Sequence, residues 1–162
     1  MKRITVTGAT GLIGRRLVAA LKERGDEVTV LSRRPRDAQR LLGVEALGWR
    51  TESEPAPVDG LAGRDGVVHL AGEPIAQRWT QESKERIRSS RELGTARLVE
   101  GLEQSYPRPH VLVCASAVGY YGARGDERLD EDAPPGTGFL AQTCARRGSG
   151  RPRPPPGSAC AS

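Results

Sequence analysis

The sequence has no apolar run long enough to span a membrane, and only 4% of its residues are aromatic. Met1-Lys2-Arg3 leads straight into a β-rich run, without the apolar stretch that a secretory signal peptide needs. These absences predict a soluble, cytoplasmic protein with no membrane partner. The 162 residues are enough for one domain with a hydrophobic core.

Cysteine and histidine are also scarce. The three cysteines, Cys114, Cys144 and Cys160, are far apart and odd in number, which argues against a disulfide framework and against a zinc site. His69 and His110 each lie at or beside a predicted strand, where a structural role is favoured over a catalytic or metal-binding one. The sequence therefore predicts no bound metal.

Acidic residues are absent from residues 145–162, which contain four arginines. The formal net charge of the chain is +5, so residues 1–144 carry a net charge of only +1. The basic character belongs to this C-terminal tail. It does not predict nucleic-acid binding by the rest of the chain.

Three glycines at fixed spacing, Gly8, Gly11 and Gly14, stand between a β-rich run and a helical pattern near the N-terminus. Glycine permits the sharp turn and the close approach of a pyrophosphate, and the N–H groups at a helix start favour an anion. An ordinary strand-to-helix turn is the alternative, but this context favours a dinucleotide site. The apolar residues expected on one face of the helix are Ile13, Leu17, Ala20 and Leu21.

The second predicted strand, Glu27–Leu31, is followed by Ser32, Arg33 and Arg34. NAD-binding domains usually have an acidic residue at this point, which binds the ribose hydroxyls. Two guanidinium groups suit a 2′-phosphate instead, because each can donate two hydrogen bonds at once. The sequence thus predicts a preference for NADP over NAD. The alternative is a solvated arginine pair on a surface loop.

Strand and helix patterns alternate through the rest of the chain. This alternation predicts an α/β fold with a doubly wound parallel sheet of the Rossmann type. The fourth predicted strand ends in Ala71-Gly72-Glu73-Pro74, where small residues would let a cofactor ribose or nicotinamide pass over the strand end. The further strands are predicted at Val44–Trp49, Asp65–Leu70 and His110–Cys114, and the further helices at Asp37–Leu42 and Thr80–Ser105.

Arg91 falls on the apolar face of the long helix, with Ile87, Gly94, Leu98 and Leu102 at helical spacing. A charge in such a place needs a partner. One interpretation is an arginine that reaches solvent or pairs with a core carboxylate. The other is an arginine that faces the cofactor crevice.

These segments together resemble the extended and atypical short-chain dehydrogenase/reductases. More narrowly, residues 1–144 resemble the epimerase-like NADP-binding proteins, of the NAD-dependent epimerase/dehydratase type, that carry a C-terminal domain of unknown function. The motifs that carry the resemblance are TGATGLIG (Thr7–Gly14), LSRRP (Leu31–Pro35), HLAGEPI (His69–Ile75), RWT (Arg78–Thr80), SRELGT (Ser90–Thr95), SAVGYYG (Ser116–Gly122) and FLAQTC (Phe139–Cys144).

The resemblance implies an NADP cofactor, with NAD less favoured, and a role for each matching residue. Ser116 matches the serine that hydrogen-bonds the reacting carbonyl or alcohol in active members. The implied cofactor-binding residues are Gly8, Thr10, Gly11, Leu12, Ile13 and Gly14 at the pyrophosphate, Ser32, Arg33 and Arg34 at the adenosine ribose and its phosphate, and Leu70, Ala71 and Gly72 along the crevice.

The superfamily's catalytic Tyr-x-x-x-Lys pair, in which the tyrosine is the general acid/base, is absent. The chain has three lysines, Lys2, Lys22 and Lys84, and none follows Ser116. The matching segment is Phe139–Cys144, where the atypical subgroup also lacks the tyrosine. Tyr120 and Tyr121 lie too soon after Ser116 to replace it. We expect them to shape the pocket, with a catalytic role for either as the alternative.

Residues 145–162 are rich in Arg, Pro, Gly and Ser, a composition that predicts a disordered tail. Related proteins continue with a helix, a strand and a substrate-binding portion, so the chain resembles a truncated member, and our hypothesis is a frameshift near Arg147. The alternative is a genuine short protein whose tail contacts acidic partners. An incomplete sheet leaves an edge and an apolar face uncovered, which predicts marginal stability or self-association.

Three functions are open at this stage. The first is the NADP-binding domain of an epimerase- or reductase-like oxidoreductase with an unknown small-molecule substrate, inactive in this short form. The second is a non-catalytic NADP-binding sensor or partner module, which the missing catalytic pair favours. The third is a fragment that binds little.

Overall fold

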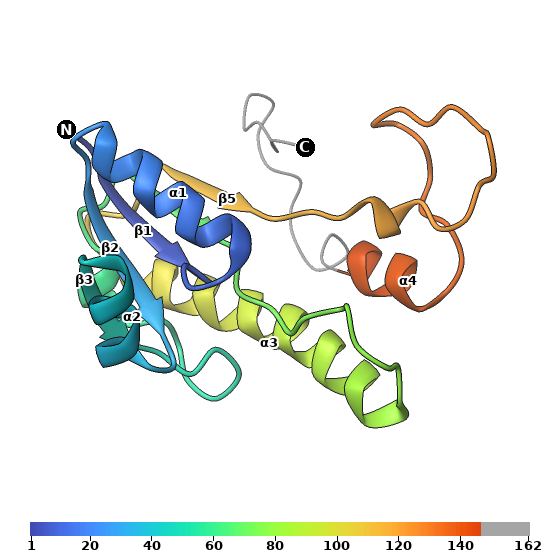
Figure 1. Cartoon of the computed structure of the whole chain (residues 1–162), viewed down its shortest axis with the longest axis horizontal. Coiled ribbons are helices and arrows are strands. Elements are labelled where there is room, and N and C mark those ends of the chain that lie inside the picture. The colour runs from blue at the N-terminus through green and yellow to red at the C-terminus, as the bar shows by residue number, and fades with distance from the viewer. Residues whose placement is uncertain (147–162) are drawn as a thin grey trace.

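The centre of the structure, a computed structural model that describes residues 1–146, is a sheet of five parallel strands in the order β3-β2-β1-β4-β5 (Figure 1). The strands are β1 (Arg3–Thr7), β2 (Glu27–Ser32), β3 (Glu45–Gly48), β4 (Gly66–His69) and β5 (Val111–Cys114). The helices are α1 (Leu12–Glu23), α2 (Pro35–Leu42), α3 (Gln81–Gln104) and α4 (Phe139–Arg146), with short 3-10 helices η1 (Val58–Gly60) and η2 (Val118–Tyr120). The predicted α/β fold and parallel sheet are confirmed. Residues 145 and 146 of the predicted tail, residues 145–162, belong to α4, so the expected disorder does not hold there, and residues 147–162 lie outside the described residues.

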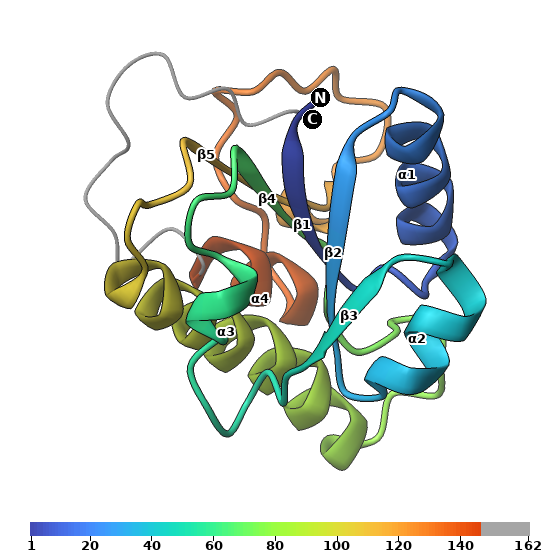
Figure 2. The ribbon, with the colours of Figure 1, turned by 90° about the vertical axis from the view of Figure 1, so that its left-hand side faces the viewer.

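Helices cover both faces of the sheet. Figure 2 shows α1 and α2 on one side of the strands and α3 on the other. One apolar core joins Val6 and Val30 to Val18 of α1, and a second joins Leu31 and Val67 to Leu98 of α3. None of the helices within residues 1–146 combines the length and apolar character needed to cross a membrane.

The strand order places a topological switch point between β1 and β4. The chain leaves β1 toward β2 and β3, and then returns across the sheet to pair β4 with the other edge of β1. Val6 is therefore paired with Val30 on one side and with Val68 on the other. In open α/β sheets the crevice at the carboxyl ends of such strands is where ligands bind.

The buried face of α1 differs from the expected one. Ile13 is 68% exposed and Ala20 is exposed, so their predicted place on the packed face is wrong. The buried residues are Gly14, Val18 and Leu21. Gly14 fixes the rotation of the helix, because a Cβ there would lie 2.4 Å from the carbonyl oxygen of Gly8.

The predicted packing face of α3 is confirmed at Ile87, Gly94 and Leu98, all buried. A capping box starts the helix: the Thr80 hydroxyl accepts the backbone N–H of Ser83, and the Ser83 hydroxyl accepts the backbone N–H of Thr80. Near the other end, α3 lies against the loop that follows β3, where a Cβ on Gly101 would approach the carbonyl oxygen of Ala56.

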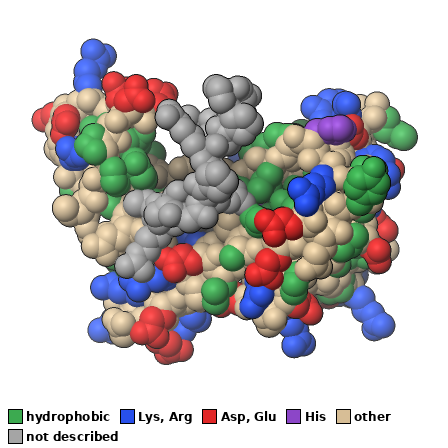
Figure 3. All heavy atoms as spheres, turned by 180° about the vertical axis from the view of Figure 1, so that it is seen from behind, with side chains coloured by type: hydrophobic (Ala, Val, Ile, Leu, Met, Phe, Trp, Pro, Cys, Tyr) green, Lys and Arg blue, Asp and Glu red, His purple; other side chains and the backbone are tan. Residues whose placement is uncertain are grey.

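The outermost strand, β5, pairs with β4 alone within the described part of the chain. Val111, its first residue, is 48% exposed. Self-association through this edge stays a prediction. On the face turned away from Figure 1, acidic and basic side chains are intermingled around small apolar patches, as the near-neutral charge of residues 1–144 leads one to expect (Figure 3).

Two carboxylates secure the amino ends of the first strands. The backbone N–H of Lys2 donates to Asp26 at 2.8 Å and lowers the pKa of that carboxyl. The backbone N–H of Arg3 donates to Asp65 at 2.7 Å, and the Lys2 ammonium lies 3.0 Å from the same side chain. Both contacts lower the pKa of Asp65.

The lowered pKa values predict acid sensitivity. Below the ordinary carboxyl pKa of about 3.9, the unfolded chain binds more protons than the native chain, so stability falls as the pH drops through the native pKa values. We expect the double variant Asp26→Asn/Asp65→Asn to be less stable at pH 7 and to lose less stability between pH 5 and pH 3. Urea unfolding at each pH measures this. Asp126→Asn, at an exposed carboxylate with no hydrogen bond within residues 1–146, is the control, and an equal change of slope there would contradict the prediction.

Candidate functional site

Two adjoining hollows lie at the carboxyl ends of β1, β2 and β4. The central hollow, of about 250 Å³, is walled by the turn after β1 and by the loop after β4. The outer hollow, of about 520 Å³, lies between the end of β2 and helix α2. Thr10, Ser32 and Arg33 line both hollows, so the two form one continuous crevice.

The crevice gathers most of the predicted cofactor residues. Leu12, Ile13 and Gly14 do not line it but form the first turn of α1 beside it. The predicted residues that line the central hollow are Gly8, Thr10, Gly11, Ser32, Arg33, Leu70, Ala71 and Gly72, and those that line the outer hollow are Thr10, Ser32, Arg33 and Arg34.

Gly8 brings the two walls of the central hollow together. Its φ of +68° is one that side chains rarely permit, and a Cβ there would lie 2.6 Å from the backbone of Leu70 and 2.7 Å from the nitrogen of Ala71. The turn after β1 therefore packs on the backbone of the loop after β4. No other residue type fits this position without moving one of these segments.

The start of α1 presents unsatisfied backbone donors. Gly11 is the N-cap residue in extended conformation, and no side-chain cap is formed. The first-turn N–H groups of a helix have no partner within the helix, and together with the helix dipole they attract an anion. Leu12 and Ile13 are 78% and 68% exposed, which leaves this turn open to a ligand.

A buried polar cluster supports the floor of the crevice. The Thr7 hydroxyl accepts the backbone N–H of Ala71 at 3.2 Å, and its oxygen lies 2.7 Å from Nδ1 of His69. The ring of Trp49 is 6.2 Å from that of His69, centroid to centroid. The cluster fixes the end of β1 relative to the loop that carries Leu70 to Gly72.

The outer hollow has a positive rim. Arg33 and Arg34 are exposed, and neither forms an ion pair within residues 1–146. Ser32 orders the turn, because its hydroxyl accepts the backbone N–H of Arg34 at 3.2 Å. Asp37, the acidic residue of this hollow, pairs with Arg40. The arginine charges are therefore available to an anionic ligand.

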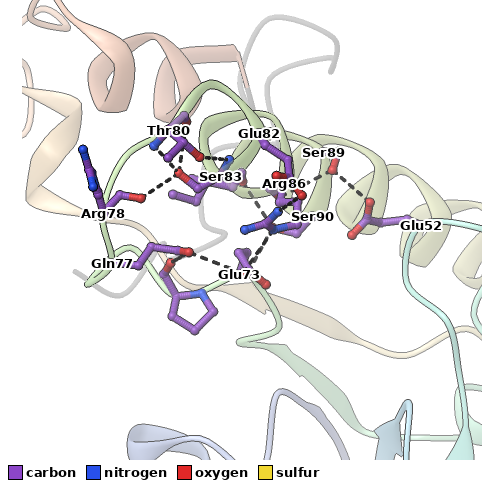
Figure 4. Close-up of polar contacts among 12 residues, drawn as sticks. Glu52, Glu73, Gln77, Arg78, Thr80, Glu82, Ser83, Arg86, Ser89 and Ser90 are labelled. Atoms are coloured by element: carbon purple, nitrogen blue, oxygen red, sulfur yellow. Dashed lines mark hydrogen bonds and ion pairs between the residues drawn. The ribbon is translucent and has the colours of Figure 1, made fainter.

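Helix α3 holds the loop after β4 in place (Figure 4). The hydroxyl of Ser90 accepts the backbone N–H of Glu73 at 2.9 Å, and Arg86 lies 3.7 Å from the Glu73 carboxylate. Arg91 donates to the carbonyl oxygens of Glu73 and Ile87, at 3.0 and 3.1 Å, and its guanidinium lies against Gly72. Arg91 thus binds the back of the crevice loop and does not line the hollow itself.

Several lining residues were not among the predicted cofactor-binding residues. Glu73 and Pro74 belong to the stretch expected at the end of the fourth strand, and Ser90 begins the SRELGT motif, so their place in these motifs was a usable signal. Thr51 and Glu52 follow β3, and the hydrogen bond from Ser89 to Glu52, at 2.8 Å, ties that loop to α3. Such a contact between distant segments has no local signature.

Ser116 does not join this crevice. It is exposed, two residues beyond β5, and lines neither hollow. Tyr120 and Tyr121 follow it in an edge-to-face pair whose centroids are 5.1 Å apart. Helix α4 packs on η2, where Leu140 contacts Gly119. The catalytic role proposed for Ser116 thus stays a prediction.

Residues 4–142 match the family described as NAD dependent epimerase/dehydratase. The chloroplastic epimerase family protein SDR39U1 homolog of Arabidopsis thaliana is 39% identical over 144 residues, which are 87% of this chain and 42% of that protein. The chain thus spans less than half the length of this relative.

Two solved structures share the fold. Human epimerase family protein SDR39U1 with NADPH superposes with a TM-score of 0.74 and 28% identity, over 91% of this chain and 48% of that one. A short-chain dehydrogenase/reductase superfamily protein from Agrobacterium tumefaciens with bound NAD gives a TM-score of 0.70 and 27% identity, over 88% and 42% of the two chains.

Proposed function

The chain belongs to the NAD dependent epimerase/dehydratase family, and on this premise we propose that it is the NADP-binding domain of an epimerase- or reductase-like oxidoreductase. The observation that carries the proposal is the continuous crevice, whose two hollows meet at Thr10, beside the uncapped start of α1. A dinucleotide needs such an arrangement, because its pyrophosphate lies between two nucleoside halves.

The residues present fit such a ligand. The first turn of α1 would hold the pyrophosphate, and the glycines leave room for it to approach the backbone. Arg33 and Arg34 would hold the 2′-phosphate at the outer hollow, and Leu70 to Gly72 would line the way to the nicotinamide half. The bound cofactor supplies hydride transfer.

NADP is favoured over NAD by the two arginines on the rim. The human protein was solved with NADPH and the Agrobacterium protein with NAD, so solved proteins of this fold bind either cofactor. At the end of β2 this chain has Ser32-Arg33-Arg34 and no acidic residue. A carboxylate there would repel a 2′-phosphate, whereas guanidinium groups bind it.

A second candidate function follows from the missing catalytic pair. No lysine follows Ser116 in the sequence, and Ser116 itself lies outside the crevice. The chain therefore has no tyrosine–lysine pair to move the proton that accompanies hydride transfer. We expect it to bind the cofactor without turning it over, which agrees with a non-catalytic NADP-binding module.

Fluorescence titration of the chain with NADPH and with NADH tests the proposal. We expect NADPH to bind at least about tenfold more tightly, since each tenfold step needs only about 1.4 kcal/mol. Equal affinities would contradict the NADP preference, and no binding of either would contradict the function. Steady oxidation of NADPH in the presence of carbonyl compounds would contradict the non-catalytic interpretation.

A further inference from the structure

Two motifs with no part in cofactor binding meet on the surface of the protein. Trp79, which follows the loop after β4, and Phe139, the first residue of α4, form an edge-to-face pair with ring centroids 5.6 Å apart. Trp79 is oriented by its indole N–H, which donates to the carbonyl oxygen of Ile75 at 2.9 Å. Trp79 is nevertheless 42% exposed and Ile75 43%, so the pair presents an accessible apolar surface.

Two cations border this surface. Lys84 Nζ lies 5.8 Å from the centroid of the Phe139 ring, and Arg88 Cζ lies 5.6 Å from the same centroid. The two residues are one turn apart on α3 and both are half-buried. Like charges at this spacing destabilise a helix, and burial increases their repulsion.

Other arginines of α3 have acidic partners, which Lys84 and Arg88 lack in the part of the chain that the structure describes. Arg86 pairs with Glu82 and Glu73, and Arg97 pairs with Glu100. Within residues 1–146, by contrast, no carboxylate lies within 4.0 Å of the charged groups of Lys84 or Arg88. Two partly desolvated positive charges thus share an aromatic ring and have no acidic partner.

The cluster lies beside the crevice. Lys84, Arg88 and Arg91 follow at helical spacing along one stripe of α3, and Arg91 contacts Gly72 in the wall of the central hollow. Helix α4, which supplies Phe139, packs both on α3 and on η2, shortly after Ser116 (Figure 1). A small molecule at the cluster would therefore be a neighbour of the crevice.

We propose that Lys84 and Arg88 bind the oxyanion of a small organic substrate, a phosphate or a carboxylate, while Trp79 and Phe139 hold its planar or apolar part. The inference rests on the proposed function, because it assigns a substrate class to a site beside the proposed cofactor crevice. An oxyanion would neutralise both cations through charge-assisted hydrogen bonds. The exposed rings would offer stacking area next to it.

Isothermal titration with phenyl phosphate, benzoate and inorganic phosphate tests the proposal on the 162-residue chain. The titrations are made with saturating NADPH, so that Arg33 and Arg34 are occupied, and again without it. We expect phenyl phosphate or benzoate to bind with NADPH present and to bind more tightly than inorganic phosphate. The stronger of the two aromatic anions identifies the oxyanion.

The double variant Lys84→Gln/Arg88→Gln should bind the aromatic anion at least about tenfold more weakly, because both charge-assisted contacts are lost. The control variant Arg97→Gln/Arg108→Gln loses the same amount of charge elsewhere and should bind the aromatic anion as tightly as the unmodified chain does. Equal weakening in both double variants, or no binding by the unmodified chain, would overturn the proposal. Thermal unfolding and NADPH affinity show whether each variant is folded.

Phe139→Leu provides a second test that keeps both charges. This variant should bind phenyl phosphate more weakly and inorganic phosphate with unchanged affinity. It tests the proposal by itself if the double variant does not fold. An unchanged affinity for phenyl phosphate would count against the aromatic part of the site. If the chain binds phenyl phosphate but not NADPH, the proposed function fails while the anion site stands.

Discussion

Gly8→Ala is expected to destabilise the protein by about 2 to 5 kcal/mol. The left-handed backbone costs a side-chain residue about 1 to 2 kcal/mol. The rest comes from overpacking, since the new Cβ would lie 2.6 Å from the carbonyl of Leu70, which is backbone and cannot rotate away. The turn after β1 would have to separate from the loop after β4, and the central hollow would change shape.

Gly25→Ala is the matched control for this variant. Gly25 has a φ of +82°, so alanine meets the same backbone cost, but nothing lies within 4 Å of a Cβ there. We therefore expect a loss of only about 1 to 2 kcal/mol. Urea unfolding gives both values. Equal losses in the two variants would mean that the contact with Leu70 can relax, and the tight joint at Gly8 would then be refuted.

The double variant Arg33→Ala/Arg34→Ala is expected to bind NADPH about 100-fold more weakly and NADH with unchanged affinity. Hydrogen bonds to charged groups contribute about 1.5 to 3 kcal/mol, and the two guanidinium groups together would supply about two factors of ten. Only NADPH has the 2′-phosphate, so only NADPH loses these contacts. Fluorescence titration with each cofactor measures both affinities.

Arg108→Ala/Arg128→Ala removes two exposed arginines that do not line the crevice, and it should leave both affinities unchanged. A parallel loss of NADPH and NADH binding in Arg33→Ala/Arg34→Ala would show that these residues support the site as a whole. A loss of NADPH binding in the control would show that long-range charge, and not contact, is responsible. Either result would remove the physical basis of the NADP preference.

The strands could be predicted because each is a short apolar run between breakers. Glu27–Ser32 and Val111–Cys114 differ from the expected ranges by one residue at one end. Their parallel arrangement followed from the alternation of strands with helices, because a crossover helix joins parallel neighbours, whereas their order in the sheet was not predicted and comes from the structure. Short apolar runs and the alternation of strands with helices can both be read along the sequence, without knowledge of contacts between distant segments.

The rotation of α1 could not be predicted in the same way. Apolar spacing favoured the face with Ile13, whereas Gly14 faces the sheet, because the backbone at Gly8 leaves no room for a side chain there. The spacing of apolar residues identifies positions where a side chain gains from burial. It does not identify a position where no side chain fits, so the buried face of a helix that follows a glycine turn is set by steric fit and not by apolar spacing.

The sequence could indicate which residues lie together at the crevice where they stand at strand ends, but not where distant loops meet. Gly8 and Leu70 lie directly after β1 and β4, and Ser32 ends β2, so parallel pairing brings the three to one edge of the sheet. Glu52 reaches the crevice because Ser89 of α3 holds its loop. That contact depends on how α3 crosses the sheet, which no short stretch of sequence specifies.

The position of β1 between β2 and β4 has a consequence for biosynthesis. β1 is made first, and its pairing with β2 needs residues no farther along than Ser32, but its other edge is completed only by residues 66–69. At ribosomal speeds of about 5 to 20 residues per second, that edge stays open for roughly 3 to 12 s after β1 is made. During this interval the nascent chain offers a bare parallel strand edge, which is a site for pairing with another chain.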